Sequence, residues 1–169
     1  IIYMHVNTAI QHHETVKSDP DRYFGCFMAD PAEYWYGEGF ITMLDDLRAD
    51  GTWKPHNNKV AIIVGSLPYS IVIANAMKKG AAKKGFEVVF DEVVQTPTSV
   101  WGPVLSKVRK LNPAAIANTH FFAGDLAQCQ LQFVENPTNS LFYYQYGALL
   151  KDFRDIAGDA SVGAMTGTG

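Results

Sequence analysis

The sequence predicts an α/β domain built on a parallel sheet with helices on both faces. From Lys59 onward, short β-rich runs alternate with longer runs of helical periodicity, in four cycles of roughly 25 to 30 residues. Such a cycle holds a strand and a right-handed helical crossover to a parallel neighbour. The first run, residues 59–64, is also continuously apolar, as expected for a strand that is covered on both faces.

The segment before this alternation has a different pattern. Residues 3–10 are typical of a strand and its loop, and residues 21–28 of a second strand. Residues 32–49 predict an aromatic-rich helix. Its expected inward positions are Tyr34, Phe40, Leu44 and Leu47. The final ten residues, 160–169, are small and β-like.

The four cycles predict four strands and four helices. The strands are expected at residues 59–64, 86–94, 114–117 and 140–146. The helices are expected at residues 71–84, 101–111, 125–135 and 149–158. Apolar side chains at helical spacing should face the sheet. They are Ile71, Ala74, Met77 and Ala81; Trp101, Val104, Leu105, Val108 and Leu111; Leu126, Cys129 and Phe133; and Leu149, Phe153 and Ile156.

Composition limits the class of protein. The 169 residues are 47% hydrophobic and 18% charged, which is typical of one globular domain. A net charge of -3 without a dense Lys/Arg block argues against a nucleic-acid partner. No apolar stretch approaches the roughly 20 residues of a membrane span, so no membrane insertion is expected. Because the chain opens on "IIYMHVN", with no methionine and no signal-type start, we expect its native beginning to be missing.

The usual motifs of catalysis and cofactor binding do not occur. The loop after the first apolar run, residues 65–70, has neither a dinucleotide fingerprint nor a phosphate loop, and no nucleophile elbow is found. Cys26 and Cys129 are about a hundred positions apart, so neither a disulfide framework nor a paired-cysteine metal site is predicted. The sequence therefore predicts that the protein is not an enzyme, and it predicts no cofactor and no metal.

The histidines give no better indication of chemistry. His12 and His13 are adjacent and point in different directions, so they are predicted to be loop histidines without a shared metal. His120 is the only histidine at a predicted strand end. Because no carboxylate or nucleophile stands near it in the pattern, a hydrogen-bonding role is favoured over general base catalysis.

Aromatic side chains follow three of the predicted strands. Tyr69 follows the first, Phe121 and Phe122 the third, and Tyr144 and Tyr146 the fourth. Taken singly, each is as well explained by packing at the core or sheet edge. Because ligands of open parallel sheets bind outside the carboxyl ends of the strands, the set together predicts an aromatic pocket for a small molecule.

Three segments carry a resemblance to a known family. They are "KVAIIVGSLPYS", "AAKKGFEVVFDEVVQTPTSVWGPVLSKVRKLNPAAI" and "DIAGDASVGAM". In order and spacing they resemble the type I periplasmic solute-binding proteins of ABC transporters, in the branch of receptors for branched-chain amino acids and amides. The resemblance implies two α/β lobes joined by hinge strands, with a ligand held between the lobes.

The resemblance also implies a division of the chain. Residues 1–30 would be a remnant of the N-terminal lobe and the first hinge strand. Residues 31–158 would be the C-terminal lobe, and residues 159–169 the second hinge crossing.

The resemblance further implies the ligand-binding residues. In the loop "HVNTAI", Thr8 matches the hydroxyl residue that holds the ligand carboxylate, with Asn7 beside it. Tyr69 matches the tyrosine after the first strand of the C-terminal lobe. Phe121 lies where amino-acid receptors often have a tyrosine, and Tyr146 near where they place a glutamate for the ligand's ammonium group. His120 completes the predicted ligand-binding set.

The tyrosine at position 146 differs from the glutamate that the amino-acid receptors have near there. A buried ammonium group needs an anion, and a neutral phenol does not supply one. We therefore expect a small amino-acid-like, carboxylate or amide ligand, aromatic ones included, resting on Tyr69, Phe121 and Tyr146. Phe122 is expected to serve packing at the start of the helix that follows.

Two function classes remain open from the sequence. The first is an extracytoplasmic receptor, in the periplasm or its equivalent, that hands its ligand to the membrane permease of an ABC transporter. The second is a ligand-sensing domain of a cytoplasmic regulator with the same two-lobed fold. An α/β enzyme ranks last, because no strand-end loop supplies a nucleophile and a base.

Overall fold

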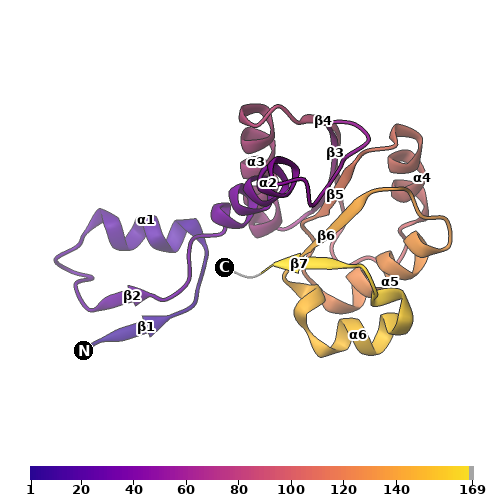
Figure 1. Ribbon diagram of the computed structural model, residues 1–169. Coiled ribbons are helices and arrows are strands. Elements are labelled where there is room, and N and C mark those ends of the chain that lie inside the picture. Colours follow the sequence, from indigo (N-terminus) through magenta and orange to yellow (C-terminus); the bar gives the residue numbers. More distant parts are fainter. Residues whose placement is uncertain (168–169) are drawn as a thin grey trace.

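The computed structural model describes residues 1–167 (Figure 1). The strands are β1 (Tyr3–His5), β2 (Cys26–Met28), β3 (Lys59–Gly65), β4 (Glu87–Val94), β5 (Ala115–Asn118), β6 (Leu141–Gln145) and β7 (Met165–Gly167). The helices are α1 (Ile10–Ser18), α2 (Tyr34–Ala49), α3 (Pro68–Lys83), α4 (Gly102–Leu111), α5 (Ala123–Val134) and α6 (Lys151–Ala157). Two short 3-10 helices, η1 (Gly147–Leu149) and η2 (Gly158–Ser161), flank α6.

The main sheet has five parallel strands in the order β4-β3-β5-β6-β7. Helices α2 and α3 cover one face, and α4, α5 and α6 cover the other (Figure 1). The side chains of β3 alternate between two cores, as the pleat of a strand requires. Val60, Ile62 and Val64 pack on the side of α2 and α3, whereas Ala61 and Ile63 pack on the opposite side. The predicted fold class, a parallel sheet with helices on both faces, is confirmed.

Local signals explain where several elements begin and end. Pro68 occupies the first turn of α3, where its missing N–H costs no hydrogen bond. Gly85 follows α3 with a φ of 74°, which a glycine adopts without strain. Asn112 ends α4 with a φ of 46°, in the left-handed region that asparagine tolerates. Helices α3 and α4 therefore stop where the sequence supplies a residue for the turn.

Helices α2 and α3 lie close together because α2 carries a glycine at their contact. A Cβ built on Gly37 would lie 2.3 Å from the carbonyl oxygen of Ile73 and 2.8 Å from the Cβ of Ala76. Only a residue without a side chain fits at that distance. The sequence pattern of α2 identifies Phe40 and Leu44 as buried, which the structure confirms, but it does not identify this contact.

Some predicted inward positions are wrong. Ile71, Leu149 and Ile156 are 37%, 40% and 44% exposed. Leu149 belongs to the 3-10 helix η1, so its helical phase does not continue into α6. Helix α6 has only seven residues, and it buries Phe153 and Ala157. A short helix presents one narrow face, which leaves the neighbouring Ile156 outside.

The first thirty residues form a small βαβ unit beside the main sheet (Figure 1). Strands β1 and β2 pair in parallel, and α1 is the crossover between them. No helix was predicted at α1, because "IQHHETVKS" has no continuous apolar stripe. In agreement with this, the structure buries none of its residues. Strand β2 is also shorter than the predicted 21–28.

The C-terminal segment contributes η2 and then β7, which pairs in parallel with β6. The predicted β-like tail is present up to residue 167, and its last two residues lie outside the described part. Among the described helices, none combines the length and the apolar character that crossing a bilayer would require.

Candidate ligand-binding site

Three strands of the main sheet end at the same level, which brings their following loops together. Ile63 of β3 pairs with Asn118 of β5, and Asn118 pairs with Tyr144 of β6. Opposite these loops lie the segments that follow β1 and β2. Together they enclose a cavity of about 440 Å³. It is lined by Val6, Asn7, Thr8, Ala9, Asp30, Tyr36, Tyr69, Phe121 and Tyr146.

The structure brings five of the six sequence-predicted site residues to this cavity. These are Asn7, Thr8, Tyr69, Phe121 and Tyr146. The sixth, His120, is completely buried and does not line it. The reason is the direction of the chain after β5, where consecutive side chains point to opposite sides.

Among the polar and aromatic residues that line the cavity, two were not predicted from the sequence. Asp30 follows β2, and Tyr36 lies in the first turn of α2. The rule that ligands lie beyond the carboxyl ends of parallel strands would have indicated Asp30, had the pairing of β1 with β2 been foreseen. Asp30 matters because it puts a carboxylate in a cavity for which the sequence predicted none.

Aromatic rings form one wall of the cavity. The rings of Tyr69 and Phe121 meet edge to face, with centroids 5.2 Å apart. Tyr36 lies 6.3 Å from Tyr69 on the other side. Edge-to-face contacts of this kind hold the rings in fixed orientations. Phe121 is half-buried in this wall, so one part of its ring packs while another lines the cavity.

Phe122 packs at the start of α5, as predicted, but only part of its side chain is covered. Its side chain is 42% exposed, and it is the residue immediately before α5. Its ring packs edge to face on the rings of Phe121 and His120, with centroids 4.9 Å and 5.6 Å away. The two adjacent phenylalanines therefore differ as expected, because Phe121 lines the cavity and Phe122 does not.

Tyr69 is prepared to donate a hydrogen bond. The side-chain amide of Gln145 donates to its phenol oxygen at 3.4 Å, and Tyr143 in turn donates to Gln145 at 3.0 Å. Burial raises the pKa of Tyr69 to about 12, with a smaller opposing effect from Gln145. The phenol thus keeps its proton at neutral pH, and that proton can be offered to a ligand oxygen.

Tyr146 has an unusual backbone conformation at the rim of the cavity. Its φ is 50° and its ψ is -59°, a sparsely populated region that costs about 1–3 kcal/mol. The next residue explains how the turn is held. A Cβ on Gly147 would lie 2.3 Å from the carbonyl oxygen of Phe121, so the turn after β6 packs directly on the loop after β5.

The loop of residues 6–9 is tied at both ends. The Asn7 side chain accepts a hydrogen bond from the Ala9 N–H at 3.0 Å, which forms a local turn. The Glu33 N–H donates to the carbonyl oxygen of Thr8 at 2.9 Å, which attaches the loop to the start of α2. The position of Asn7 is therefore fixed by a hydrogen bond within the loop, and that of Thr8 by a hydrogen bond to the residue before α2.

Glu33 places a second carboxyl group behind the cavity. Its side chain is only 2% exposed, and within residues 1–167 its Oε2 has no hydrogen-bond partner. It is close enough to Tyr69 to contribute to the raised pKa of that phenol. A buried carboxyl oxygen without a partner costs free energy, and Glu33 itself does not line the cavity.

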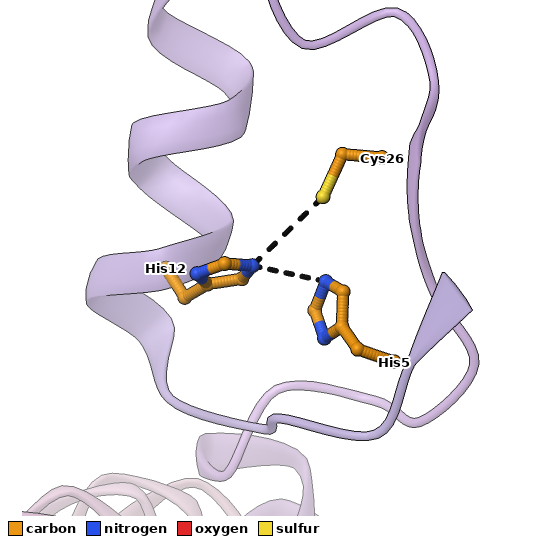
Figure 2. Close-up of side chains that lie close together, drawn as sticks. All are labelled: His5, His12 and Cys26. Carbon is orange, nitrogen blue, oxygen red and sulfur yellow. Dashed lines mark hydrogen bonds between the residues drawn. The ribbon is translucent and has the colours of Figure 1, made fainter. Parts of the chain in front are cut away.

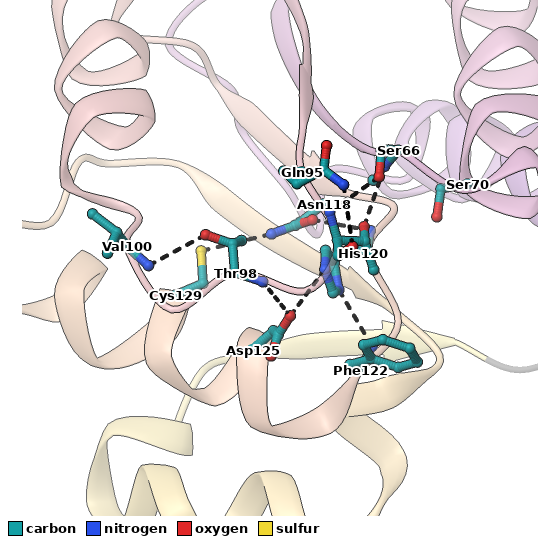
Figure 3. Close-up of polar contacts among 12 residues, drawn as sticks. Ser66, Ser70, Gln95, Thr98, Val100, Asn118, His120, Phe122, Asp125 and Cys129 are labelled. Carbon is teal, nitrogen blue, oxygen red and sulfur yellow. Dashed lines mark hydrogen bonds and ion pairs between the residues drawn. The ribbon is translucent and has the colours of Figure 1, made fainter.

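His120 supports the loop that presents Phe121 (Figure 3). Its Nδ1 accepts a hydrogen bond from the Phe122 backbone N–H at 3.3 Å, and the His120 backbone N–H donates to Asn118 Oδ1 at 3.0 Å. Its Nε2 lies 3.1 Å from Asp125 Oδ2 without the alignment of a hydrogen bond. Burial lowers the pKa of His120, and Asp125 opposes this only partly, so the imidazole is neutral.

This neutral histidine predicts an acid-dependent loss of stability. The His120 pKa is lowered in the folded chain and returns to about 6.5 on unfolding. As the pH falls below 6.5, the unfolded state takes up the proton more readily, so the free energy of unfolding decreases. Urea denaturation between pH 7.5 and about 5 should show this slope, and His120→Gln should flatten it. His13 is exposed, so His13→Gln is the control and should retain the slope. Equal slopes in the natural chain and in both variants would contradict the prediction.

The fold is that of one lobe of a type I periplasmic binding protein. A solved structure from Silicibacter pomeroyi, described as a candidate branched-chain amino acid ABC transporter, is 51% identical over 98% of this chain, with a TM-score of 0.94. The chain covers 42% of that protein. This similarity agrees with the resemblance to the solute-binding proteins of ABC transporters that the sequence carries.

More distant structures share the fold. A branched-chain amino acid ABC transporter from Thermus thermophilus with bound valine is 17% identical, with a TM-score of 0.73 over 98% of this chain and 40% of its own. A solute-binding protein from R. palustris in complex with benzoate is also 17% identical, with a TM-score of 0.65 over 80% of this chain and 35% of its own. No protein-family model and no curated protein sequence matches the chain.

Proposed function

We propose that this chain is the ligand-capturing part of an extracytoplasmic solute-binding protein, which delivers a small molecule to the membrane permease of an ABC transporter. The observation that carries the proposal is the cavity in which Tyr69, Phe121 and Tyr146 face the loop that holds Asn7 and Thr8. This cavity has aromatic walls with a few polar tips, which is the usual make-up of a small-molecule site.

The two sides of the cavity belong to different parts of the proposed protein. Residues 1–30 are proposed to be a portion of the N-terminal lobe with the first hinge strand, and residues 31–158 the C-terminal lobe. Residues 159–169 are proposed to form the second hinge crossing. Closure of the lobes would then bring further residues onto the ligand, as hinge motion does in two-lobed receptors.

The lining suggests how a ligand is held. The phenol of Tyr69 donates to a carboxylate or amide oxygen, and the Thr8 hydroxyl offers a further donor. Phe121 and Tyr146 carry the apolar body of the ligand. Asp30 offers a carboxylate to an ammonium group. The valine and the benzoate bound by the distant relatives are both small carboxylates with apolar bodies, and both chemistries suit this lining.

Isothermal titration of the full-length protein with valine, leucine and benzoate tests the proposal. We expect micromolar or tighter binding of at least one of them. If the ligand is an amino acid, Asp30→Asn should weaken its binding by about tenfold, because an ammonium group loses a charged partner. If the ligand is benzoate, the same substitution should change its affinity by less than about twofold. Absence of binding to any small carboxylate would contradict the proposed function.

The alternative is a ligand-sensing domain of a cytoplasmic regulator with the same two-lobed fold. The 51% identity to the Silicibacter protein favours the transport receptor. Fractionation of cells that express the natural gene distinguishes the two. A transport receptor is released with the extracytoplasmic fraction, and a regulator stays with the cytoplasm.

A further inference from the structure

The βαβ unit at the start of the chain gathers three side chains that bind metals in many proteins. In the β1-β2 pair, Tyr3 lies opposite Cys26 and His5 lies opposite Met28. His5 and Cys26 therefore project from the same face of the pair. Helix α1 is the crossover that covers this face, and His12 stands near its start. Figure 2 shows the two imidazole rings and the thiol directed toward one another.

The distances suit a single ion. His12 Nε2 lies 2.9 Å from His5 Nε2 and 4.0 Å from Cys26 Sγ. All three potential ligand atoms lie within 4.8 Å of one another. A tetrahedral zinc ion, with nitrogen at about 2.0–2.1 Å and sulfur at about 2.3 Å, places such atoms about 3.3 to 3.6 Å apart. Small movements of the side chains are enough to reach that geometry.

We propose that His5, His12 and Cys26 form a binding site for a borderline-soft divalent metal ion of the Zn²⁺ type. Imidazole nitrogen and thiolate sulfur are the donors that such ions prefer, and two histidines with one cysteine exclude Mg²⁺ and Ca²⁺, which take oxygen ligands. Three protein ligands leave the fourth position for water or another donor. The half-buried position of all three residues leaves the site open to an ion from solvent.

The hydrogen bonds of His5 show which proton must move when it coordinates an ion. His5 Nδ1 accepts the Asn7 N–H at 3.1 Å, so a neutral His5 carries its proton on Nε2 and donates it to His12. Coordination through His5 Nε2 moves this proton to Nδ1 and releases the Asn7 N–H. That hydrogen bond is exposed, so water replaces it.

No metal site was predicted from the sequence, because the only histidines close together in it are the neighbours His12 and His13, which point in different directions. The actual partners are distant in sequence, and only the pairing of β1 with β2 and the crossover of α1 bring them together. None of the three side chains lines the ligand cavity, although His5 accepts a hydrogen bond from Asn7, which does. The inference does not depend on the proposed transport function. His13 is exposed on the same helix and lies outside the cluster, which makes it a matched control.

Titration of the metal-free, reduced full-length protein with ZnCl₂, followed by competition with a chromophoric chelator, tests the proposal. We expect one equivalent of Zn²⁺ in the natural chain, binding weakened about tenfold or more in His12→Gln and Cys26→Ser, and a change of less than about twofold in His13→Gln. Equal binding by all four proteins, or no stoichiometric binding by the natural chain, would overturn the proposal.

Alkylation of the natural protein gives a second readout that needs no variant. Cys26 is partly exposed, whereas Cys129 is completely buried and burial raises the pKa of its thiol to about 12. Iodoacetamide should therefore modify Cys26 alone, as peptide mass spectrometry will show. Stoichiometric Zn²⁺ should slow this reaction several-fold, and Mg²⁺ should not. An alkylation rate at Cys26 that Zn²⁺ leaves unchanged would count against the site even if the variants fold poorly.

Discussion

Replacing Phe121 by alanine is expected to weaken ligand binding by about 10- to 100-fold while the chain remains folded. Burial of a phenylalanine side chain is worth about 1.5–3 kcal/mol, and about 1.4 kcal/mol corresponds to tenfold in affinity. The ring lines the cavity and orients Tyr69 by an edge-to-face contact at 5.2 Å. Its loss therefore removes apolar contact area and loosens the donor beside it. Isothermal titration with the best of the three small carboxylates measures the effect.

The matched control is the next residue in the chain. Phe122 is 42% exposed and does not line the cavity, so Phe122→Ala should change the affinity by less than about threefold. Both variants should unfold at temperatures close to that of the natural chain, since neither ring is fully buried. Equal losses of affinity in the two variants, or a large loss only in Phe122→Ala, would show that the cavity is not the ligand site.

Replacing Gly37 by alanine is expected to destabilise the protein by about 3 kcal/mol, at the upper end of the usual cost of overpacking. The new Cβ would lie 2.3 Å from the carbonyl oxygen of Ile73 and 2.9 Å from the backbone nitrogen of Met77. Backbone atoms in the middle of α3 cannot move without shifting the whole helix away from α2. Urea denaturation of the full-length protein measures the loss.

The same helix supplies the control for this prediction. Gly39 is exposed, and a Cβ built there meets no atom within 4 Å. Gly39→Ala should stabilise the protein by about 0.5–1 kcal/mol, because alanine is the better helix former. The two alanine variants of α2 should therefore differ by nearly 4 kcal/mol. Equal stabilities would mean that α2 and α3 are not packed as closely as the structure shows.

The sequence pattern predicts the main sheet well because each strand and helix carries its own periodic signal. Strand β3 is a continuous apolar run, and α4 and α5 show apolar side chains at helical spacing. Such patterns depend on which face of an element is buried, and the face is a local property. The prediction fails where an element is short or polar, as in α1, which buries none of its residues.

The candidate site could be predicted only in part. Tyr69, Phe121 and Tyr146 follow strands whose carboxyl ends meet at one edge, so their meeting follows from the alternation of strands and helices. Asp30 and Glu33 could not be placed, because their position depends on how the small βαβ unit lies beside the main sheet. His120 was expected at the ligand, but the loop after β5 turns its ring into the core.

The sequence by itself determined the class of fold, the succession of strands and helices along the chain and the aromatic character of the candidate cavity. These follow from hydrophobic periodicity and from the parallel connection of consecutive strands. Only the tertiary structure decided which residues become neighbours across long separations, such as Gly37 with Ile73, or His5 and His12 with Cys26. The physical reason is that such contacts depend on the packing of whole elements, and no local pattern along the chain records that packing.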